Sequence, residues 1–183
     1  MGMIETERIR NCFTRALSSY DKNADAQHRI SRKLISLLPR YTGTHYDRAL
    51  EIGCGTGGFT SCLKSSCRIR DWTLNDLCEV CKKPVNKLFP EQFPTFIIGD
   101  AEQITFAGKF DLIASASVFQ WIKQPETFYR KLAGLLVPQG TLLFSTFAPG
   151  NLYEIRELTN RGLDYPPATK IQEWLSSDFR LLH

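Results

Sequence analysis

The chain has 183 residues, of which 43% are hydrophobic and 23% are charged, as is usual for one soluble globular domain. A chain of this length buries about 70% of its unfolded surface in a single core and needs no disulfide to fold. The net charge of +4 is too small for a nucleic-acid-binding surface but suits an acidic protein partner. No apolar run is long enough to span a membrane, and the first residues are too charged for a signal peptide, so we expect a cytoplasmic protein.

The cysteines include one pair, Cys78 and Cys81, with the two-residue gap of a zinc knuckle. Cys62 and Cys67 do not complete such a site with the required spacing. Cys54 lies within a glycine-rich turn, where a metal would compete with a ligand. We therefore expect reduced thiols and no metal site.

Residues 1–40 are predicted to form a helical N-terminal cap. Apolar residues recur at helical spacing over residues 8–38, and Pro39 is expected to end the segment. Phe13 and Tyr20 lie seven residues apart, so they fit either one apolar helix face or a binding pocket. The basic residues of this cap either form a solvated face or meet an acidic partner: Arg15, Arg29, Arg32 and Lys33.

A short apolar run, Ala49–Leu50, leads into Glu51 and then a segment rich in glycine. This pattern predicts a strand that turns into a helix, expected over residues 59–64, through a backbone that a cofactor can approach closely. The glycines of the turn are Gly53, Gly55, Gly57 and Gly58. Their spacing also fits the dinucleotide-binding fingerprint, so the turn alone leaves two classes of enzyme open.

The charge of Glu51 helps to separate these classes, because it lies at the carboxyl end of the strand, where open parallel sheets bind ligands. A dinucleotide would bring an anionic pyrophosphate to this place, and a nearby carboxylate would repel it by about 1 to 4 kcal/mol per charge pair. S-adenosylmethionine brings an ammonium and a sulfonium instead. The sequence therefore favours an S-adenosylmethionine site.

Two further acids follow predicted strands. The second strand is expected over residues 69–75 and ends at Asp76, which can accept hydrogen bonds from both ribose hydroxyls or can cap the next helix. The third strand is expected over residues 95–98, and Asp100 after it either binds an adenine amine or serves a simple turn. The lysines between these strands are expected to form a solvated face: Lys82, Lys83 and Lys87.

The apolar run over residues 110–116 predicts a strand in the middle of a parallel sheet. Gln120 and Trp121 follow it, and Trp121 either lines the crevice between substrate and cofactor or is partly buried in the core. A helix over residues 125–136 comes next.

The last part of the chain is predicted to begin with a turn over residues 137–140 and a fifth strand over 141–147. Two helices are expected after it, over 151–162 and over 169–176, the second with Thr169 as its N-cap. A sixth strand is expected over residues 179–182. The alternation of strands and helices predicts a three-layer parallel α/β sheet in a single domain, with its cofactor-binding core in residues 47–150 and an incomplete C-terminal part in 151–183.

The motifs along this chain resemble those of class I S-adenosylmethionine-dependent methyltransferases. They are Glu51–Gly57, Asp76, Asp100–Ala101, residues 110–113, and Pro138 with Gly140. A narrower resemblance, nearly end to end, is to the malonyl-acyl-carrier-protein O-methyltransferases of biotin synthesis. It is carried by Phe13, Arg15, Ala16, Tyr20, Gln27, Gly99–Glu102, Gln120–Trp121, residues 144–146, Gly150, Leu152 and Glu154.

The resemblance implies a Rossmann-like methyltransferase sheet and methyl transfer from S-adenosylmethionine to the free carboxyl of a malonyl group on acyl carrier protein. It implies cofactor binding by Glu51, Gly53, Gly55, Gly57, Asp76, Leu77, Asp100, Ala101 and Ser115. It implies a methyl-transfer pocket shaped by Tyr20, Gln120 and Trp121. No catalytic residue stands out, because a carboxylate is already ionised near pH 7 and needs no general base.

The chain departs from the family at two places. Ala116 stands where the family commonly has an asparagine, so one hydrogen bond is expected to be lost or replaced. The last strand of the family's sheet has no counterpart, so we expect a C-terminally truncated sheet with an unprotected edge strand. A lid carrying an arginine that grips the substrate carboxylate would be missing with it. We therefore expect a chain that binds the cofactor better than it turns over. A monomer is favoured.

Three other functions remain open from the sequence. The first is a class I methyltransferase for another small-molecule acceptor, since the cofactor motifs do not report the substrate. The second is a non-catalytic S-adenosylmethionine-binding module. The third is an NAD-dependent oxidoreductase, which tight NAD binding would reveal.

Overall fold

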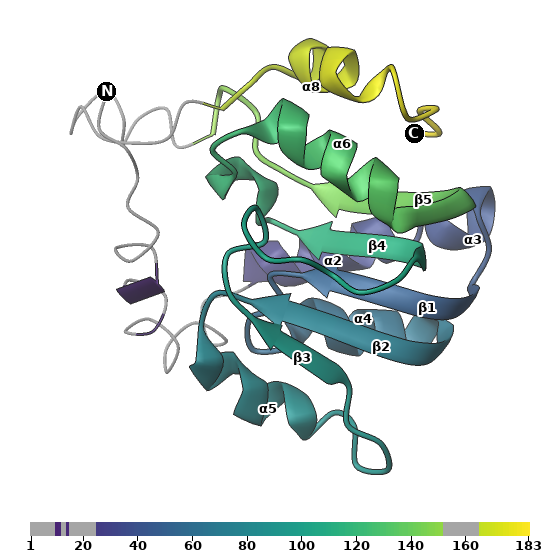
Figure 1. The fold of residues 1–183 in the computed structure, drawn as a ribbon, viewed down its shortest axis with the longest axis vertical. Coiled ribbons are helices and arrows are strands. Elements are labelled where there is room, and N and C mark those ends of the chain that lie inside the picture. Colours follow the sequence, from purple (N-terminus) through teal and green to yellow (C-terminus); the bar gives the residue numbers. More distant parts are fainter. Residues whose placement is uncertain (1–9, 12–13, 15–24, 152–164) are drawn as a thin grey trace.

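A computed structural model of the chain describes residues 10, 11, 14, 25–151 and 165–183. Its centre is a five-stranded parallel sheet in the order β3-β2-β1-β4-β5, with helices on both faces (Figure 1). The strands are β1 His45–Ile52, β2 Arg68–Asp76, β3 Thr95–Ile98, β4 Phe110–Ala116 and β5 Leu136–Ser145. The predicted three-layer α/β fold is therefore confirmed.

The order of the strands indicates where along the edge of the sheet a ligand can bind. From β1 the chain proceeds outward to β2 and β3, then crosses back to β4 on the other side of β1. Glu51 near the end of β1 lies opposite Leu74 of β2 and Ala114 of β4. In open α/β sheets such a reversal of strand order leaves a crevice at the carboxyl ends of the strands. The loops after β1 and β4 border that crevice.

The helices form a layer on each face of the sheet. Their bounds are α2 Asp25–Ile35, α3 Leu38–Tyr41, α4 Gly58–Ser66, α5 Lys82–Asn86, α6 Pro125–Leu135 and α8 Ala168–Leu175, with short 3-10 turns η2 Glu79–Cys81 and η3 Phe119–Trp121. In Figure 1, α2 and α4 lie behind the sheet, α6 lies in front of it, and α8 follows the outer side of α6. No helix among the described residues is long and apolar enough to cross a membrane.

Alternating side chains of the strands pack into apolar cores on the two faces of the sheet. Ala49 and Leu112 point to the α2 and α4 side, where they pack with Leu34 and Leu63. Their neighbours in the strands, Leu50 and Ile113, point the other way, as does Ile52. They pack with Phe128 and Leu132 of α6 and with residues of α8. Both faces are apolar because a central parallel strand is covered by helices on each side.

Several predicted elements are confirmed. The strands β3 and β4 begin and end at the expected residues, and β2, α4 and α6 agree within one or two residues at each end. The lysines of α5 and its end are exposed, as expected of a solvated face: Lys82, Lys83 and Lys87.

Two helix boundaries were predicted wrongly. Pro39 does not end the N-terminal helix, because α2 already ends at Ile35 and Pro39 occupies the first turn of α3. That position suits proline, since the first turn of a helix needs no amide donor there. Thr169 is not an N-cap, because α8 begins at Ala168 after Pro167 in extended conformation, without a side-chain cap.

Two strand predictions at the C-terminal side also need correction. The strand β5 begins at Leu136, before the predicted turn, and its pairing jumps from Phe110↔Leu136 to Leu112↔Thr141. The predicted turn is therefore an irregularity inside β5, with Gln139 at φ 67. Residues 179–182 form no strand, because they have no neighbouring strand to pair with in the described part of the chain. Residues 152–162 of the expected helix lie outside the described residues.

Candidate active site

The glycine turn after β1 has a backbone that side chains would obstruct. Gly53, Gly55 and Gly57 adopt φ angles of 70°, 52° and 94°, a region that favours glycine. A Cβ at Gly53 would lie 2.4 Å from a methyl carbon of Val118, and one at Gly57 would lie 2.8 Å from a methyl carbon of Leu88. A Cβ at Gly55 would meet no atom within 4 Å. The middle of the turn is therefore open to a ligand, while its two ends are packed against protein.

The end of β2 holds this turn in place. The Gly53 and Cys54 amides donate to the Asn75 carbonyl at 2.8 and 3.0 Å. The Gly55 amide donates to Oδ2 of Asp76 at 2.8 Å, and the Cys78 amide donates to Oδ1 at 2.8 Å. Asp76 thus holds the segment after β2 and joins it to the glycine turn. It does not cap the next helix as one interpretation predicted, because η2 begins at Glu79 with Cys78 as its N-cap and without a side-chain cap. Since a carboxylate has about four acceptor positions, these two bonds leave capacity for a ligand diol.

Glu51 is a buried acid beneath the turn, with only 2% of its surface exposed. Neither carboxyl oxygen has a hydrogen-bond partner within the described residues. Burial raises the pKa of Glu51 to about 8; the nearby Thr60 hydroxyl, which falls short of hydrogen-bond geometry, partly opposes this rise, and the charge of Asp76 adds to it. An isolated buried acid is costly unless a partner compensates it. A cationic ligand group would supply that partner.

Other buried polar atoms share this lack of partners within the described residues. They are Gln27 Oε1, Thr60 Oγ1, Asn86 Oδ1, Ser117 Oγ and Gln120 Oε1. Thr60 lies in the first turn of α4, directly after the glycine turn, and Ser117 and Gln120 follow β4. Unpaired buried polar atoms are rare in native proteins. The atoms of Thr60, Ser117 and Gln120 follow the carboxyl ends of β1 and β4, a position that fits a polar ligand in the crevice.

Ser117 is a site residue that the sequence did not indicate. It adopts φ 59°, which is uncommon for a residue other than glycine. Its amide donates to the carbonyl and hydroxyl oxygens of Ser145 at 3.2 and 3.0 Å, and its carbonyl accepts from Gln120 Nε2 at 2.7 Å. Its only sequence signal is its position one residue after Ala116, where the chain departs from the family. Thr60 likewise carried no signal, because its burial depends on packing around Glu51.

The loop after β3 lies beside the end of β2. The Gly99 amide donates to the Asp76 carbonyl at 2.9 Å, and Asn75 Nδ2 donates to the Gly99 carbonyl at 3.0 Å. Asp100 Oδ1 accepts from the Glu102 amide at 3.0 Å, and Ala101 is buried. The structure therefore brings the predicted ribose acid, Asp76, close to the predicted adenine loop.

The remaining predicted residues lie around the same edge. The Ser115 hydroxyl is fully buried and donates to the Ile52 carbonyl at 2.9 Å, which ties β4 to the end of β1. Leu77, directly after Asp76, is half-buried. Trp121 is half-buried within η3, as the interpretation of partial burial predicted, and its place in the crevice stays a prediction. Tyr20 lies outside the described residues.

Thiols surround Asp76, and the N-terminal segment reaches them. Burial raises the pKa of the Cys54, Cys78 and Cys81 thiols. The Cys78 sulfur accepts from the Thr14 hydroxyl at 3.8 Å and donates to the Arg10 carbonyl at 3.7 Å. These thiols therefore act as packing groups rather than as thiolate nucleophiles.

A second depression lies away from these residues. It is an open groove of ≈ 700 Å³ at the amino ends of β1 and β2. Basic and acidic side chains both line it, among them Lys64, Arg68, Asp47 and Asp111. None of the candidate site residues contributes to its lining.

Comparison with known proteins identifies relatives and structural neighbours. The chain matches the family described as methyltransferase domain over residues 50–144. A malonyl-[acyl-carrier protein] O-methyltransferase of Porphyromonas gingivalis is 44% identical over 180 residues, which make up 98% of this chain and 69% of that protein. One of Haemophilus ducreyi is 41% identical, covering 98% of this chain and 71% of that protein.

Among solved structures, the N-methyltransferase NodS from Bradyrhizobium japonicum in complex with S-adenosyl-L-homocysteine has a TM-score of 0.72. Its sequence identity is 20%, and the match covers 92% of this chain and 84% of that chain, so it shows the fold alone. The curated relatives are far more similar in sequence and cover nearly the whole chain. By this similarity, the chain belongs to the malonyl-[acyl-carrier protein] O-methyltransferase family.

Proposed function

We propose that this chain transfers a methyl group from S-adenosylmethionine to the free carboxyl of a malonyl group on acyl carrier protein, an early step of biotin synthesis. The observation that carries the proposal is Glu51, a buried acid under an open glycine turn whose two oxygens have no partner in the described part of the chain. The buried carboxyl of Glu51 needs a cationic partner, and the glycine turn above it allows a ligand to lie against the backbone. The names of the relatives supply the acceptor.

The residues present fit the cofactor. Glu51 would face the cationic methionine end, and the backbone of Gly53, Gly55 and Gly57 would lie against it. Asp76 would accept from the ribose hydroxyls, and Ser115 would keep the end of β1 fixed through its bond to Ile52. Leu77, Asp100 and Ala101 would surround the adenine. When bound, S-adenosylmethionine supplies a sulfonium methyl that a carboxylate oxygen can attack in line, forming the O–CH3 bond while the C–S bond breaks and a neutral thioether leaves.

The acceptor side of the site needs no general base. A malonyl carboxylate is ionised near pH 7, since carboxyl groups titrate near pH 4. The contribution of the chain is then to orient this carboxylate and to exclude water from it. Ser117 and Gln120 offer unpaired polar atoms at the end of β4, and Trp121 with Tyr20 would shape the pocket. Their role is to hold the reacting oxygen in line with the methyl group.

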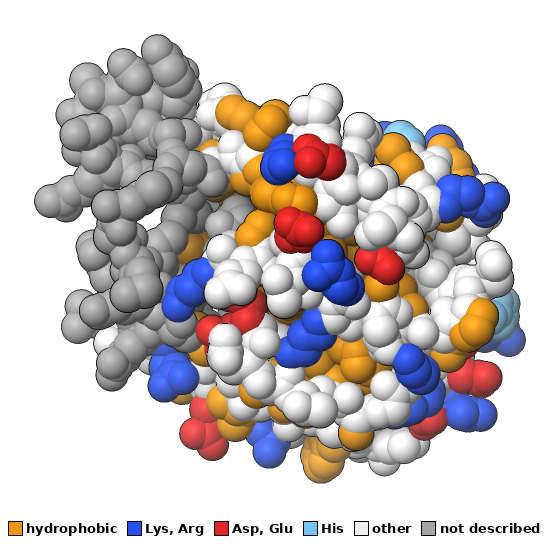
Figure 2. Space-filling model, turned by 45° about the horizontal axis from the view of Figure 1, so that its top comes forward, with side chains coloured by type: hydrophobic (Ala, Val, Ile, Leu, Met, Phe, Trp, Pro, Cys, Tyr) orange, Lys and Arg blue, Asp and Glu red, His pale blue; other side chains and the backbone are white. Residues whose placement is uncertain are grey.

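A basic helix face suits the acidic carrier protein as partner. The helices α2, α4 and α5 share one face of the sheet. There Trp72 packs against the cluster that contains residues of α2 and α4 and against the cluster that contains Val85 of α5. Exposed basic residues on or beside these helices are Arg29, Arg32, Lys33, Lys64, Lys82, Lys83 and Lys87. On the α8 side of the molecule, acidic and basic side chains lie interspersed (Figure 2). The exposed acids Asp25 and Glu79 lie on or beside the same helices, and the basic residues outnumber them. An excess of charge of one sign favours association with a partner of the opposite sign.

This face also borders the candidate site. A Cβ at Gly58, directly after the glycine turn, would lie 3.6 Å from the His28 ring of α2. A carrier protein on this face would therefore present its malonyl group near the carboxyl edge of the sheet. We propose this face as its docking surface.

A growth experiment tests the proposal. The chain is expressed in a biotin-requiring strain that lacks its own malonyl methyltransferase, with Glu51→Ala as the inactive control. Growth without biotin is expected for the parent chain and not for the variant. If the parent binds S-adenosylhomocysteine but does not restore growth, another acceptor or a non-catalytic cofactor-binding module is favoured. If it binds NAD and not S-adenosylhomocysteine, the cofactor assignment is wrong.

A further inference from the structure

Lys131 of α6 holds the loop that follows β3. Its ammonium donates to the carbonyls of Ala101 at 2.8 Å, Glu102 at 3.1 Å and Ile104 at 2.5 Å. All three carbonyls belong to one short loop, and they converge on a single side chain from another element. An ammonium has three donors, so this arrangement uses its full capacity.

Glu102 fixes the same loop from the opposite direction. Its Oε2 accepts from the Lys123 amide at 3.0 Å, and its Oε1 accepts from the Gln124 amide at 2.9 Å. These amides immediately precede α6, where the helix dipole favours a negative charge. The loop and α6 are therefore joined by a basic residue of the helix and by an acidic residue of the loop.

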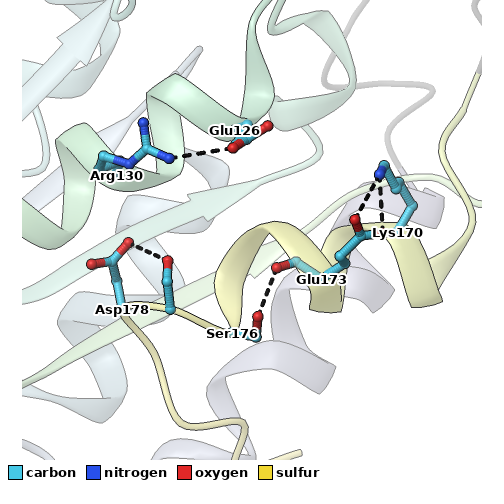
Figure 3. Close-up of polar contacts among 7 residues, drawn as sticks. Glu126, Arg130, Lys170, Glu173, Ser176 and Asp178 are labelled. Carbon is cyan, nitrogen blue, oxygen red and sulfur yellow. Dashed lines mark hydrogen bonds and ion pairs between the residues drawn. The ribbon is translucent and has the colours of Figure 1, made fainter.

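The environment of Lys131 supports a specific role. The side chain is half-buried, and its ammonium lies 5.5 Å from the centre of the Phe106 ring. Burial lowers the pKa of Lys131, and the charges of Asp100 and Glu102 partly offset this effect. By contrast, Arg130 next to it points to solvent and pairs with Glu126 at 3.3 Å (Figure 3). The two neighbouring cations of α6 thus have different surroundings: Lys131 is half-buried against the loop and Arg130 is exposed.

The clamped loop carries Asp100 and Ala101, the residues assigned to adenine. Ala101 is buried, and its carbonyl is one of the three that Lys131 engages. Glu102 also joins this loop to the segment that carries Gln120 and Trp121, because Lys123 and Gln124 continue from η3. The adenine side and the acceptor side of the site are therefore connected through one residue.

We propose that Lys131, together with Glu102, is a positioning residue that fixes the loop of Asp100 and Ala101 against the adenine of the cofactor. This inference rests on the proposed function. Lys131 does not contact the reacting atoms; it acts through the loop. Without it, the loop would retain its sequence but sample other conformations, and the cost would appear in cofactor affinity. The rate at saturating cofactor would change little.

The test compares Lys131→Met, Lys131→Arg and the matched surface control Arg130→Met. Methionine keeps most of the apolar stem and removes all three donors, whereas arginine keeps charge and donors. Titration calorimetry measures binding of S-adenosylhomocysteine and of adenosine, which has no methionine part. For Lys131→Met we expect both dissociation constants to rise about tenfold, or about 1.4 kcal/mol, with kcat at saturating S-adenosylmethionine within twofold of the parent. Lys131→Arg should recover most of the affinity, and Arg130→Met should match the parent.

Parental affinity of Lys131→Met for both ligands would overturn the proposal. A loss of kcat without a change in either dissociation constant would also overturn it. If Lys131→Met does not fold, Glu102→Gln decides: weaker binding of both ligands supports the clamp, and unchanged binding refutes it. If the parent chain itself fails to bind S-adenosylhomocysteine, the proposed function fails instead.

Discussion

Asp76 accepts a hydrogen bond from the Gly55 amide at 2.8 Å, so the acid at the end of β2 holds the turn that follows β1. Its other oxygen accepts from the Cys78 amide at 2.8 Å. One carboxylate therefore organises two segments of the site, and its proposed contact with a ribose would make use of its remaining acceptor positions. The ribose acid and the glycine turn form a single unit.

Replacing this acid should weaken cofactor binding more than its ribose contact alone would. In Asp76→Asn the amide can accept only through its oxygen, so its nitrogen faces one of the two backbone donors. Charge-assisted hydrogen bonds contribute about 1.5 to 3 kcal/mol, so we expect the dissociation constant of S-adenosylhomocysteine to rise roughly 10- to 100-fold. Calorimetry measures this change. Asp71→Asn, an exposed acid on the same strand, should leave the affinity unchanged.

Glu51 should make the stability of the ligand-free protein depend on pH. Its pKa is raised from 4.5 to about 8 on folding, so between these values the folded state holds a proton that the unfolded state has lost. The contribution of Glu51 to the free energy of unfolding is therefore fully present below about pH 4.5 and declines as pH rises to about 8. The slope is at most about 1.4 kcal/mol per pH unit.

The variant Glu51→Gln removes this titration. Urea unfolding of both proteins between pH 5 and pH 8 measures the difference in their free energies of unfolding. We expect Glu51→Gln to become more stable relative to the parent as pH rises. A difference that stays constant across this range would show that Glu51 does not titrate in it.

Cofactor binding should release a proton from Glu51. At pH 7 a carboxyl with a pKa of about 8 is mostly protonated, and a cation placed beside it favours the charged form. Binding of S-adenosylhomocysteine, which carries the ammonium, should therefore release roughly one proton and strengthen as pH rises to about 8. Calorimetry in buffers of different ionisation enthalpy counts the protons. Glu51→Gln should release none, and equal release by both proteins would exclude this carboxyl as the source.

Gly53 should tolerate no side chain. In Gly53→Ala the residue would carry a strained φ of 70°, and its Cβ would lie 2.4 Å from Val118. We expect a loss of stability of about 2 kcal/mol or more, measured by urea unfolding. Adding Val118→Ala should recover only part of it, because the backbone strain remains. The control Gly134→Ala, in α6 with nothing within 4 Å of its Cβ, should be neutral or stabilising by up to about 1 kcal/mol.

The basic face of α2 should determine how well the carrier protein is used. The double variant Arg32→Glu and Lys33→Glu should raise the KM for the malonyl carrier protein roughly tenfold, because it reverses two exposed charges. The KM for a malonyl thioester of a small neutral thiol should not change. Added salt should weaken the parent's preference for the carrier protein, since these charges are exposed. An unchanged KM for the carrier protein would place its docking surface elsewhere.

The sequence predicted the strands best where local signals bound them. Thr95–Ile98 lies between Pro94 and Gly99, and both of its ends were placed correctly. Residues 179–182 were apolar enough for a strand, but a strand requires a partner that local sequence does not reveal. Thr169 has the preferred chemistry of an N-cap, yet Pro167 in extended conformation sets the start of α8.

The residues of the candidate site also fall into two groups, those that the sequence predicted and those that it did not. The glycine turn, Asp76 and Asp100 follow from spacing, because strand ends in a parallel sheet converge at one edge. Ser117 and Lys131 did not stand out, because their partners lie far along the chain: Ser145 for the first, and the loop carbonyls of Ala101 to Ile104 for the second. The sequence predicted Glu51 as a site residue because it lies at the carboxyl end of a strand. Its burial and raised pKa depend on how α4 packs over it.

The most direct measurement is a single-turnover reaction with the chain in excess over malonyl carrier protein and with S-adenosylmethionine labelled in the methyl group. We expect label in a methyl ester of the malonyl carrier protein and none in acetyl carrier protein, which lacks the free carboxyl. Glu51→Ala should abolish the labelling at low cofactor concentration. Equal labelling of both carrier proteins, or binding of the cofactor with no label in the malonyl form, would contradict it.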